Sequence, residues 1–311
     1  MSDQLESTTA TSVRRLALLE RGVELGLADA ACAEARSGRG SLVLVEGAAG
    51  MGKTRLLDAV AERAAASDAV VLSARGGELE RGFPYGVVRQ LFEPRIARAT
   101  AAQRDALLAG AASMAGAIFG EPAGDAAVAE TPDSFSLIHG LFWLTANLSD
   151  DSPLVMVLDD AHWADALSLR FLIYLARRIE ELPIMLLISV RPKEPASEHA
   201  LLTQLFDSKG ARVLRLAALS EPGVAQLVRG ELSEDADDRF VRACHDATAG
   251  NPFYLRELLT SLSADGVAAT GEAADAIREV HPETLSRAIL LRLSRLPAEA
   301  TALARAAAVL G

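Results

Sequence analysis

One eight-residue stretch constrains this 311-residue chain more than any other feature. Residues 47–54 read GAAGMGKT, directly after the apolar run Ser41–Glu46, and a helical pattern starts at Lys53. Glycines at this spacing let successive backbone N–H groups curl around an anion, and the N-terminus of the next helix adds the positive end of its dipole. The order of strand, loop and helix therefore predicts a phosphate loop that binds a nucleoside triphosphate.

Two side chains of this loop carry specific expectations. Lys53 would reach the β- and γ-phosphates as a point charge, and the Thr54 hydroxyl would coordinate Mg2+. The predicted nucleotide-binding residues of the loop are Gly47, Ala48, Ala49, Gly50, Met51, Gly52, Lys53, Thr54 and Arg55.

A pair of carboxylates follows a later apolar run. Residues 154–158 are Leu-Val-Met-Val-Leu, and Asp159 and Asp160 come next. We expect Asp159 to hold Mg2+ together with Thr54, and Asp160 to orient or deprotonate the attacking water. Arg191 follows the apolar run 184–190 and would stand at the carboxyl edge of the sheet, where a cation can contact the γ-phosphate. The candidate catalytic residues are therefore Lys53, Asp159, Asp160 and Arg191, with a solvated surface arginine as the alternative for Arg191.

Short apolar runs alternate with helical patterns over the first two thirds of the chain. Besides the three runs above, apolar segments occur at 69–74 and 213–219. Strands that alternate with helices predict an α/β fold, in which a parallel sheet carries helices on both faces. A long insert over residues 76–150 is expected to be helical around 83–92, 102–119 and 133–148, with a surface loop at 120–127.

The remaining sequence has no strand pattern. We predict helices at 221–231, 236–249 and 253–262. The expected division of the chain is a disordered tail (1–14), a nucleotide-binding domain (15–219), a helical domain (220–265), a linker (266–282) and a further helical segment (283–311).

Composition excludes several classes of function. The net charge of −11 and the pI near 5.0 are the opposite of a nucleic-acid-binding surface. No apolar run approaches the length of a membrane span, and no secretory signal precedes the domain, so a cytoplasmic location is expected. Cys32 and Cys244 lack metal-type spacing and predict free thiols.

Five motifs resemble those of the signal-transduction ATPases with numerous domains, the STAND class. They are GAAGMGKT, VLDDAHWAD (157–165), SVRP (189–192), GNPFYLREL (250–258) and ELERGFPYGVVRQLFEP (78–94). The last motif narrows the resemblance to the large ATP-binding regulators of the LuxR type (LAL, MalT-like).

This resemblance implies a P-loop NTPase of the additional-strand, AAA-like class, with five parallel strands and one strand inserted between the phosphate-loop strand and the Asp159 strand. The helices after residue 219 would form a lid that brings Pro252 to the adenine or ribose, and Arg21 would contact the base from the N-terminal side. Residues 283–311 would begin a winged-helix module that continues beyond this chain. The implied ligands are ATP or ADP with Mg2+, and the implied partners are an inducer or regulatory protein. DNA would be contacted only by a C-terminal region that these residues do not include.

These sequence features are compatible with three functions. The first is a nucleotide-dependent switch in a transcription activator, with slow ATP hydrolysis and a nucleotide-dependent homo-oligomer. The second is an ATPase with sustained turnover that performs mechanical work, for which Arg170, Arg177 or Arg178 could supply a charge to a neighbouring subunit. The third is a small-molecule kinase with Asp160 as its base, for which the sequence offers no acceptor pocket.

Overall fold

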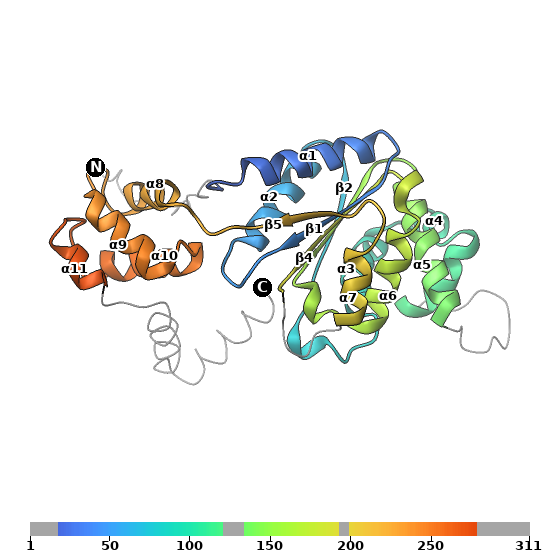
Figure 1. Cartoon of the computed structure of the whole chain (residues 1–311). Coiled ribbons are helices and arrows are strands. Elements are labelled where there is room, and N and C mark those ends of the chain that lie inside the picture. The colour runs from blue at the N-terminus through green and yellow to red at the C-terminus, as the bar shows by residue number, and fades with distance from the viewer. Residues whose placement is uncertain (1–17, 121–133, 193–198, 279–311) are drawn as a thin grey trace, which may run out of the picture.

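A five-stranded parallel sheet forms the centre of the larger of two bodies in the computed structural model, which describes residues 18–120, 134–192 and 199–278 (Figure 1). Its strands are β1 (Ser41–Glu46), β2 (Val70–Arg75), β3 (Leu154–Asp159), β4 (Ile184–Val190) and β5 (Arg212–Arg215). Their order in the sheet is β2-β3-β4-β1-β5, and every neighbouring pair is parallel. This confirms the predicted fold class, including the insertion of one strand, β4, between β1 and β3.

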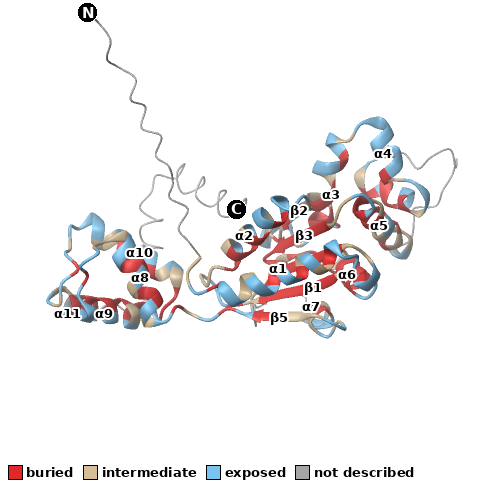
Figure 2. Ribbon diagram, turned by 90° about the horizontal axis from the view of Figure 1, so that it is seen from above, coloured by how far each residue is buried: buried red, intermediate tan, exposed pale blue. Residues whose placement is uncertain are grey.

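The central strands are mostly apolar because both of their faces are covered. Leu42 and Leu44 of β1 belong to the cluster formed with one helical layer, whereas Val43 and Val45 pack against the other, as the two-residue period of a strand requires. The first layer contains α3 (Gly86–Arg98), α5 (Ser134–Ser149), α6 (Ala166–Ala176) and α7 (His199–Phe206), and the second contains α1 (Gly22–Arg36) and α2 (Lys53–Ala65). Figure 2 shows the buried strands between these layers.

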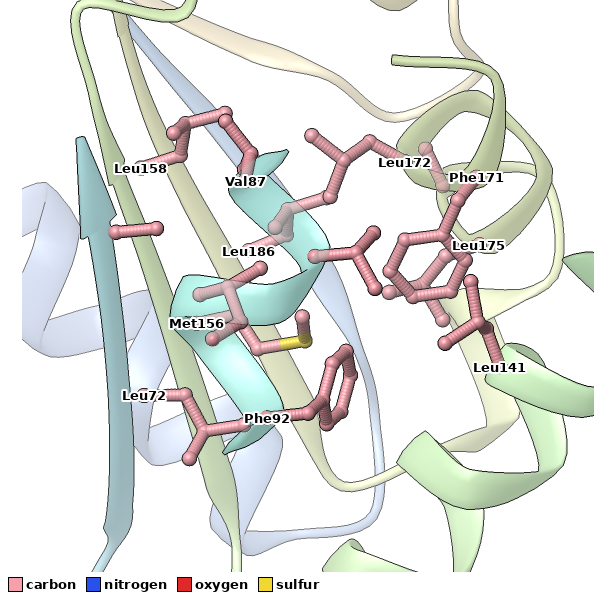
Figure 3. Packing of buried hydrophobic residues seen from close by; sticks show 14 of the residues in the cluster. Leu72, Val87, Phe92, Leu141, Met156, Leu158, Phe171, Leu172, Leu175 and Leu186 are labelled. Carbon is pink, nitrogen blue, oxygen red and sulfur yellow. The ribbon is translucent and has the colours of Figure 1, made fainter. Parts of the chain in front are cut away.

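The first layer is the larger part of the core. Figure 3 shows Met156 and Leu186 of the sheet together with Phe92 of α3 and Phe171 of α6. The two phenylalanine rings meet edge to face, with centroids 6.0 Å apart, which is a favoured aromatic geometry. The shorter elements of this body are α4 (Ala101–Leu107) and the 3-10 turns η1 (Glu78–Glu80), η2 (Gly110–Phe119), η3 (Ala161–Trp163) and η4 (Ile179–Glu181).

A smaller helical body follows β5, and we call it the lid bundle. It consists of α8 (Glu221–Glu231), α9 (Asp238–Thr248), α10 (Pro252–Ala264) and α11 (Ala273–Arg278). Phe240, Val241, Cys244 and Ala247 form the buried stripe of α9 at helical spacing, and they belong to a cluster separate from the core around the sheet. The lid bundle therefore has its own core (Figures 1 and 2).

Several predicted boundaries differ from the structure. The apolar spacing of residues 16–35 predicts a first helix from residue 16, but α1 begins at Gly22, because Glu20 is left-handed (φ 53°). The helix expected at 83–92 begins at Gly86, after left-handed Tyr85 (φ 59°), and continues to Arg98. The single helix expected at 102–119 divides into α4 and η2 at Gly110 (φ 62°). A residue in this backbone region interrupts a right-handed helix, and only glycine signals it in a sequence.

The predicted linker also needs correction. Helix α11 lies within residues 266–282, and its Ala274 and Ile277 are buried in the core of the lid bundle. These two side chains lie three positions apart, on one face of α11, and that face packs against α9. The neighbouring sequence is rich in alanine and acidic residues, which is why it was predicted to be a linker. The predicted tail (1–14), the loop at 121–127 and the segment 283–311 lie outside the described residues.

No helix within the described ranges combines the length and the apolar composition that crossing a membrane requires.

Candidate nucleotide-binding site

The phosphate loop joins β1 to α2, as the sequence predicts. Gly50 and Gly52 have positive φ angles of 79° and 84°, which L-residues with side chains rarely adopt. Gly50 also lacks room for a side chain, since a Cβ there would lie 2.6 Å from Asn251 Oδ1 and 2.8 Å from the Cβ of Phe253. The loop is thus shaped both by its own backbone and by a close approach of the lid bundle.

Lys53 and Thr54 begin α2 and point back toward the loop and the sheet. The Lys53 side chain is buried, and its Nζ donates to the carbonyls of Gly47 (2.8 Å) and Ala48 (3.0 Å). Thr54 Oγ1 donates to Asp159 Oδ2 at 2.6 Å. The structure therefore brings the phosphate loop and the first acidic residue together, although 105 residues separate Thr54 from Asp159 in the chain.

Asp159 is held in one orientation by three donors. Its Oδ1 accepts the Ser189 hydroxyl at 2.5 Å and the Asp160 N–H at 3.0 Å, and its Oδ2 accepts Thr54. Ser189 is fully buried in β4, the strand next to β3 in the sheet. Ser189 lies in the motif SVRP, but no role was predicted for it. Its position two residues before Arg191, at the carboxyl end of a central strand, could have indicated one.

Asp160 has a left-handed backbone (φ 49°), which turns its carboxylate into a ring of cationic and imidazole groups. Arg75 Nη2 lies 3.2 Å from Oδ2, and Arg191 Nε and His162 Nε2 lie 3.6 Å and 3.7 Å from Oδ1. Arg191 thus stands next to the acidic pair, at the predicted edge of the sheet. Arg75 was missed because the β2 run was read only to residue 74; its position as the last residue of that strand could have indicated it.

His162 is neutral in this environment. Burial, followed by the charges of Arg191 and Lys53, lowers the pKa of His162 to about 3. Its Nδ1 accepts the Arg191 backbone N–H at 3.4 Å, so the proton resides on Nε2, the nitrogen that faces Asp160. A neutral, buried imidazole with this hydrogen bond supports the neighbouring Arg191 and Asp160 and does not exchange protons near pH 7.

The first turn of α10 lies directly on the phosphate loop. Asn251 Nδ2 donates to the Ala49 carbonyl at 3.0 Å, and the Phe253 N–H donates to the Gly50 carbonyl at 3.3 Å. Asn251 Oδ1 also caps α10 by accepting the N–H groups of Phe253 and Tyr254. Only Pro252 was predicted at this place from the sequence, because the contact between Asn251 and the loop depends on tertiary structure.

A pocket of about 500 Å³ lies between the two bodies. The pocket is lined by three groups of residues. They are Ala49, Gly50, Gly52, Lys53, Thr54 and Arg55 of the phosphate loop and α2; Arg75, Asp160 and Arg191 at the carboxyl edge of the sheet; and Pro252, Phe253, Tyr254 and Arg256 of α10. Its volume is within the range of about 300–1,000 Å³ for small-molecule sites.

A smaller, more apolar pocket adjoins it and shares Gly52, Arg55, Pro252 and Arg256. Arg21 lines this second pocket with Leu18, Leu19 and Met51 on the N-terminal side, opposite Leu219 and Leu227. The Arg21 side chain is buried and donates to the carbonyls of Ala217 (2.7 Å) and Met51 (3.3 Å). Arg21 and Pro252, predicted from opposite ends of the sequence, therefore line one cavity next to the phosphate loop.

The three arginines considered for a neighbouring subunit lie elsewhere. Arg170, Arg177 and Arg178 line an open groove with residues of α5 and α7, on the helical layer that covers the sheet. Arg177 donates to Gln204 at 3.1 Å, and the Arg178 guanidinium lies 3.7 Å from the ring centroid of Tyr174.

The oxygen atoms of Thr54 and Asp159 beside the phosphate loop suit a small, hard cation. The Thr54 hydroxyl and the Asp159 carboxylate are adjacent oxygen ligands, the type that Mg2+ prefers. Among the described residues, no group of three or more His, Cys, Asp or Glu side chains could hold a metal. A Mg2+ that arrives with a nucleotide needs only one or two protein ligands, because phosphate and water oxygens complete its shell.

Comparisons with known proteins agree with this geometry. A family model described as an AAA ATPase domain matches residues 17–188, more than half of the chain. The ORC2 protein of Aeropyrum pernix in its ADP form has a TM-score of 0.52 and 14% identity, covering 87% of this chain and 70% of that one.

Two further structures are similar. The ORC1 protein of the same organism, solved in complex with DNA, gives a TM-score of 0.50 and 19% identity, with 91% and 70% of the two chains covered. A STAND protein of Pyrococcus horikoshii with a tetratricopeptide repeat sensor gives 0.44 and 18% identity, and this chain spans only 29% of its length. The two ORC structures, with TM-scores of 0.52 and 0.50, support a common fold. No curated protein matched the sequence.

Proposed function

Because the chain belongs to the family of AAA ATPase domains, we propose that its two bodies form an ATP- and ADP-binding switch. ATP binds with its phosphates at the loop of residues 47–54 and its base in the smaller pocket beside Arg21 and Pro252. The Asp159 and Asp160 pair supports slow hydrolysis, and the bound nucleotide sets the position of the lid bundle.

The contact between α10 and the phosphate loop is the observation that carries this proposal. Asn251 and Phe253 donate to the carbonyls of Ala49 and Gly50, so the lid bundle is attached to the backbone that would surround the phosphates. A ligand can shift a conformational equilibrium only by interacting differently with its two states. A nucleotide at this loop can meet that condition, since residues of the loop and of α10 line the same pocket.

Each side chain at the loop has a proposed task. Lys53 moves its ammonium group from the carbonyls of Gly47 and Ala48 to the β- and γ-phosphates. Thr54 and Asp159 hold Mg2+, which when bound neutralises phosphate charge. Asp160 accepts a proton from the attacking water, and Arg191 stabilises charge on the transferred phosphoryl group.

The finer assignment rests on the motif resemblance to LuxR-type regulators. We propose that the switch belongs to a transcription activator, that an inducer or regulatory protein acts on it, and that ATP favours a homo-oligomer. DNA would be bound by a region outside these residues. A shift from about 1:99 to 99:1 between two states needs about 5.5 kcal/mol of differential binding, more than one charged contact supplies, so a second ligand is required.

An ATPase with sustained turnover is the second candidate. It requires an arginine that can reach a neighbouring subunit's phosphate. Arg170 is exposed on α6 and suits this role, whereas Arg177 and Arg178 already contact Gln204 and Tyr174. The switch is the better supported function because α10 contacts the phosphate loop directly.

Phosphate release distinguishes the two candidates. With excess Mg-ATP, we expect about one equivalent of phosphate or less over hours, with nucleotide still bound after gel filtration, because a switch retains its product between the loop and the lid bundle. The measurement is a coupled phosphate assay with Lys53→Ala as the blank. Sustained release of many equivalents above this blank would overturn the switch in favour of the working ATPase.

A further inference from the structure

The segment ahead of α1 connects the nucleotide-binding body to the lid bundle within three residues. Leu19 packs against the core of the lid bundle, Glu20 contacts the start of α8, and Arg21 donates to Met51 of the phosphate loop. Arg21 also donates to Ala217, in the connection between β5 and α8. We call residues 19–21 the strap.

Glu20 is the member of the strap that contacts a helix terminus. Its carboxylate accepts the Ser220 backbone N–H at 2.8 Å and the Ser220 hydroxyl, directly at the N-cap of α8. The first N–H groups of a helix lack partners within the helix, and a negative charge there interacts favourably with the helix dipole. The left-handed backbone of Glu20 (φ 53°) turns the side chain in this direction.

Gly223 accommodates this carboxylate. A Cβ at Gly223 would lie 2.6 Å from Glu20 Cδ and 2.7 Å and 2.8 Å from its two carboxylate oxygens. Glycine inside a helix is unfavourable relative to alanine, and Gly223 lies in the first turn of α8 without a positive φ that would require it. A side chain at position 223 would therefore displace the Glu20 carboxylate, the end of a flexible side chain, from its contact with α8.

We infer that Glu20 is a positioning residue, which seats on α8 in the space left by Gly223 and fixes the lid bundle relative to the phosphate loop. The smaller pocket depends on this arrangement, since Leu19 and Arg21 of the strap form one wall and Leu219 and Leu227, which flank the contact, form another. Loss of the contact would let α8 move relative to the phosphate loop and would speed the dissociation of a nucleotide whose base lies in the smaller pocket. This last consequence rests on the proposed function, whereas the contact itself does not.

A double-mutant cycle on thermal unfolding without nucleotide tests the contact. Gly223→Ala is expected to lower Tm in the natural sequence, because the new methyl group displaces the carboxylate. In the Glu20→Ala background the same change is expected to raise Tm, because the space is empty and alanine favours the helix. Gly230→Ala is the matched control on the same helix: a Cβ there meets nothing within 4 Å, so it should raise Tm in both backgrounds.

A second readout tests the positioning role. Glu20→Ala and Gly223→Ala should each speed the dissociation of a fluorescent ADP analogue about three- to tenfold, the range that corresponds to a lost helix cap, and the double variant should be no faster. Glu20→Gln retains an acceptor for Ser220 and should restore most of the slow rate. Gly230→Ala should leave it unchanged.

The outcomes separate the contact from the nucleotide site. An equal effect of Gly223→Ala in both backgrounds would overturn the contact. Coupled Tm values with an unchanged dissociation rate in Glu20→Ala would overturn the positioning role. Failure of the natural sequence to bind the ADP analogue at all would overturn the proposed function together with the positioning role, while the Tm cycle would still report the contact.

Discussion

Replacing Lys53 by alanine should weaken the binding of Mg-ATP and of ADP by about ten- to a hundredfold. The ammonium group is buried beside the phosphate loop, 2.8 Å and 3.0 Å from two loop carbonyls, where an anion would receive its hydrogen bonds. A hydrogen bond to a charged group contributes about 1.5–3 kcal/mol, and about 1.4 kcal/mol is a factor of ten in affinity. Isothermal titration calorimetry with each nucleotide measures the loss.

Lys209→Ala is the matched control for this prediction. The Lys209 side chain is 88% exposed and pairs with Glu180, away from the loop, so nucleotide affinity should not change. Unfolding in the absence of nucleotide shows whether Lys53→Ala remains folded. Folded Lys53→Ala protein that binds ATP as tightly as Lys209→Ala would contradict the site assignment.

Asp160→Asn should reduce ATP hydrolysis by about 10²- to 10⁴-fold, the usual contribution of a general base, and leave nucleotide affinity nearly unchanged. Asparagine is the suitable replacement because it tolerates the left-handed backbone of Asp160 (φ 49°) and keeps the shape of the side chain. Single-turnover phosphate release, with affinity measured on the same preparation, separates chemistry from binding.

Two further variants define the role of Asp160. Asp159→Asn should raise the Mg2+ concentration needed for nucleotide binding and slow hydrolysis, because Asp159 and Thr54 are the proposed oxygen ligands of the metal. Asp238→Asn alters a carboxylate that is 84% exposed and should have no effect. Equal losses of affinity and hydrolysis in Asp160→Asn would refute the separate roles of the two carboxylates.

The sheet could be predicted because its strands are buried on both faces. Leu154–Asp159 and Ile184–Val190 read as uninterrupted apolar runs, and both have the predicted bounds to within one residue. The strand order required the motif resemblance, because the sequence of β1 does not reveal that β4 lies beside it. Helix starts were less predictable, since the left-handed residues Glu20 and Tyr85 carry no signal in their side chains.

The parts of the candidate site that consist of consecutive residues could be predicted from the sequence. The phosphate loop and the acidic pair are local motifs, and the fold brings Thr54 to Asp159. Arg75, Ser189 and Asn251 were missed as site residues because their roles depend on contacts between distant elements. The contact between Gly223 and Glu20 could not be predicted either, because the two residues lie 203 positions apart in the chain and meet only in the folded structure.

Amide hydrogen exchange of the lid bundle tests the switch most directly. The natural sequence would be measured without nucleotide, with ADP, and with Mg2+ and a non-hydrolysable ATP analogue, using Lys53→Ala as the blank. We predict that residues 220–224 and 251–256 exchange differently in the ADP and ATP-analogue states, and that Lys53→Ala shows no such difference. Identical exchange of these residues in all three states, with nucleotide shown to be bound, would contradict a lid controlled by the γ-phosphate.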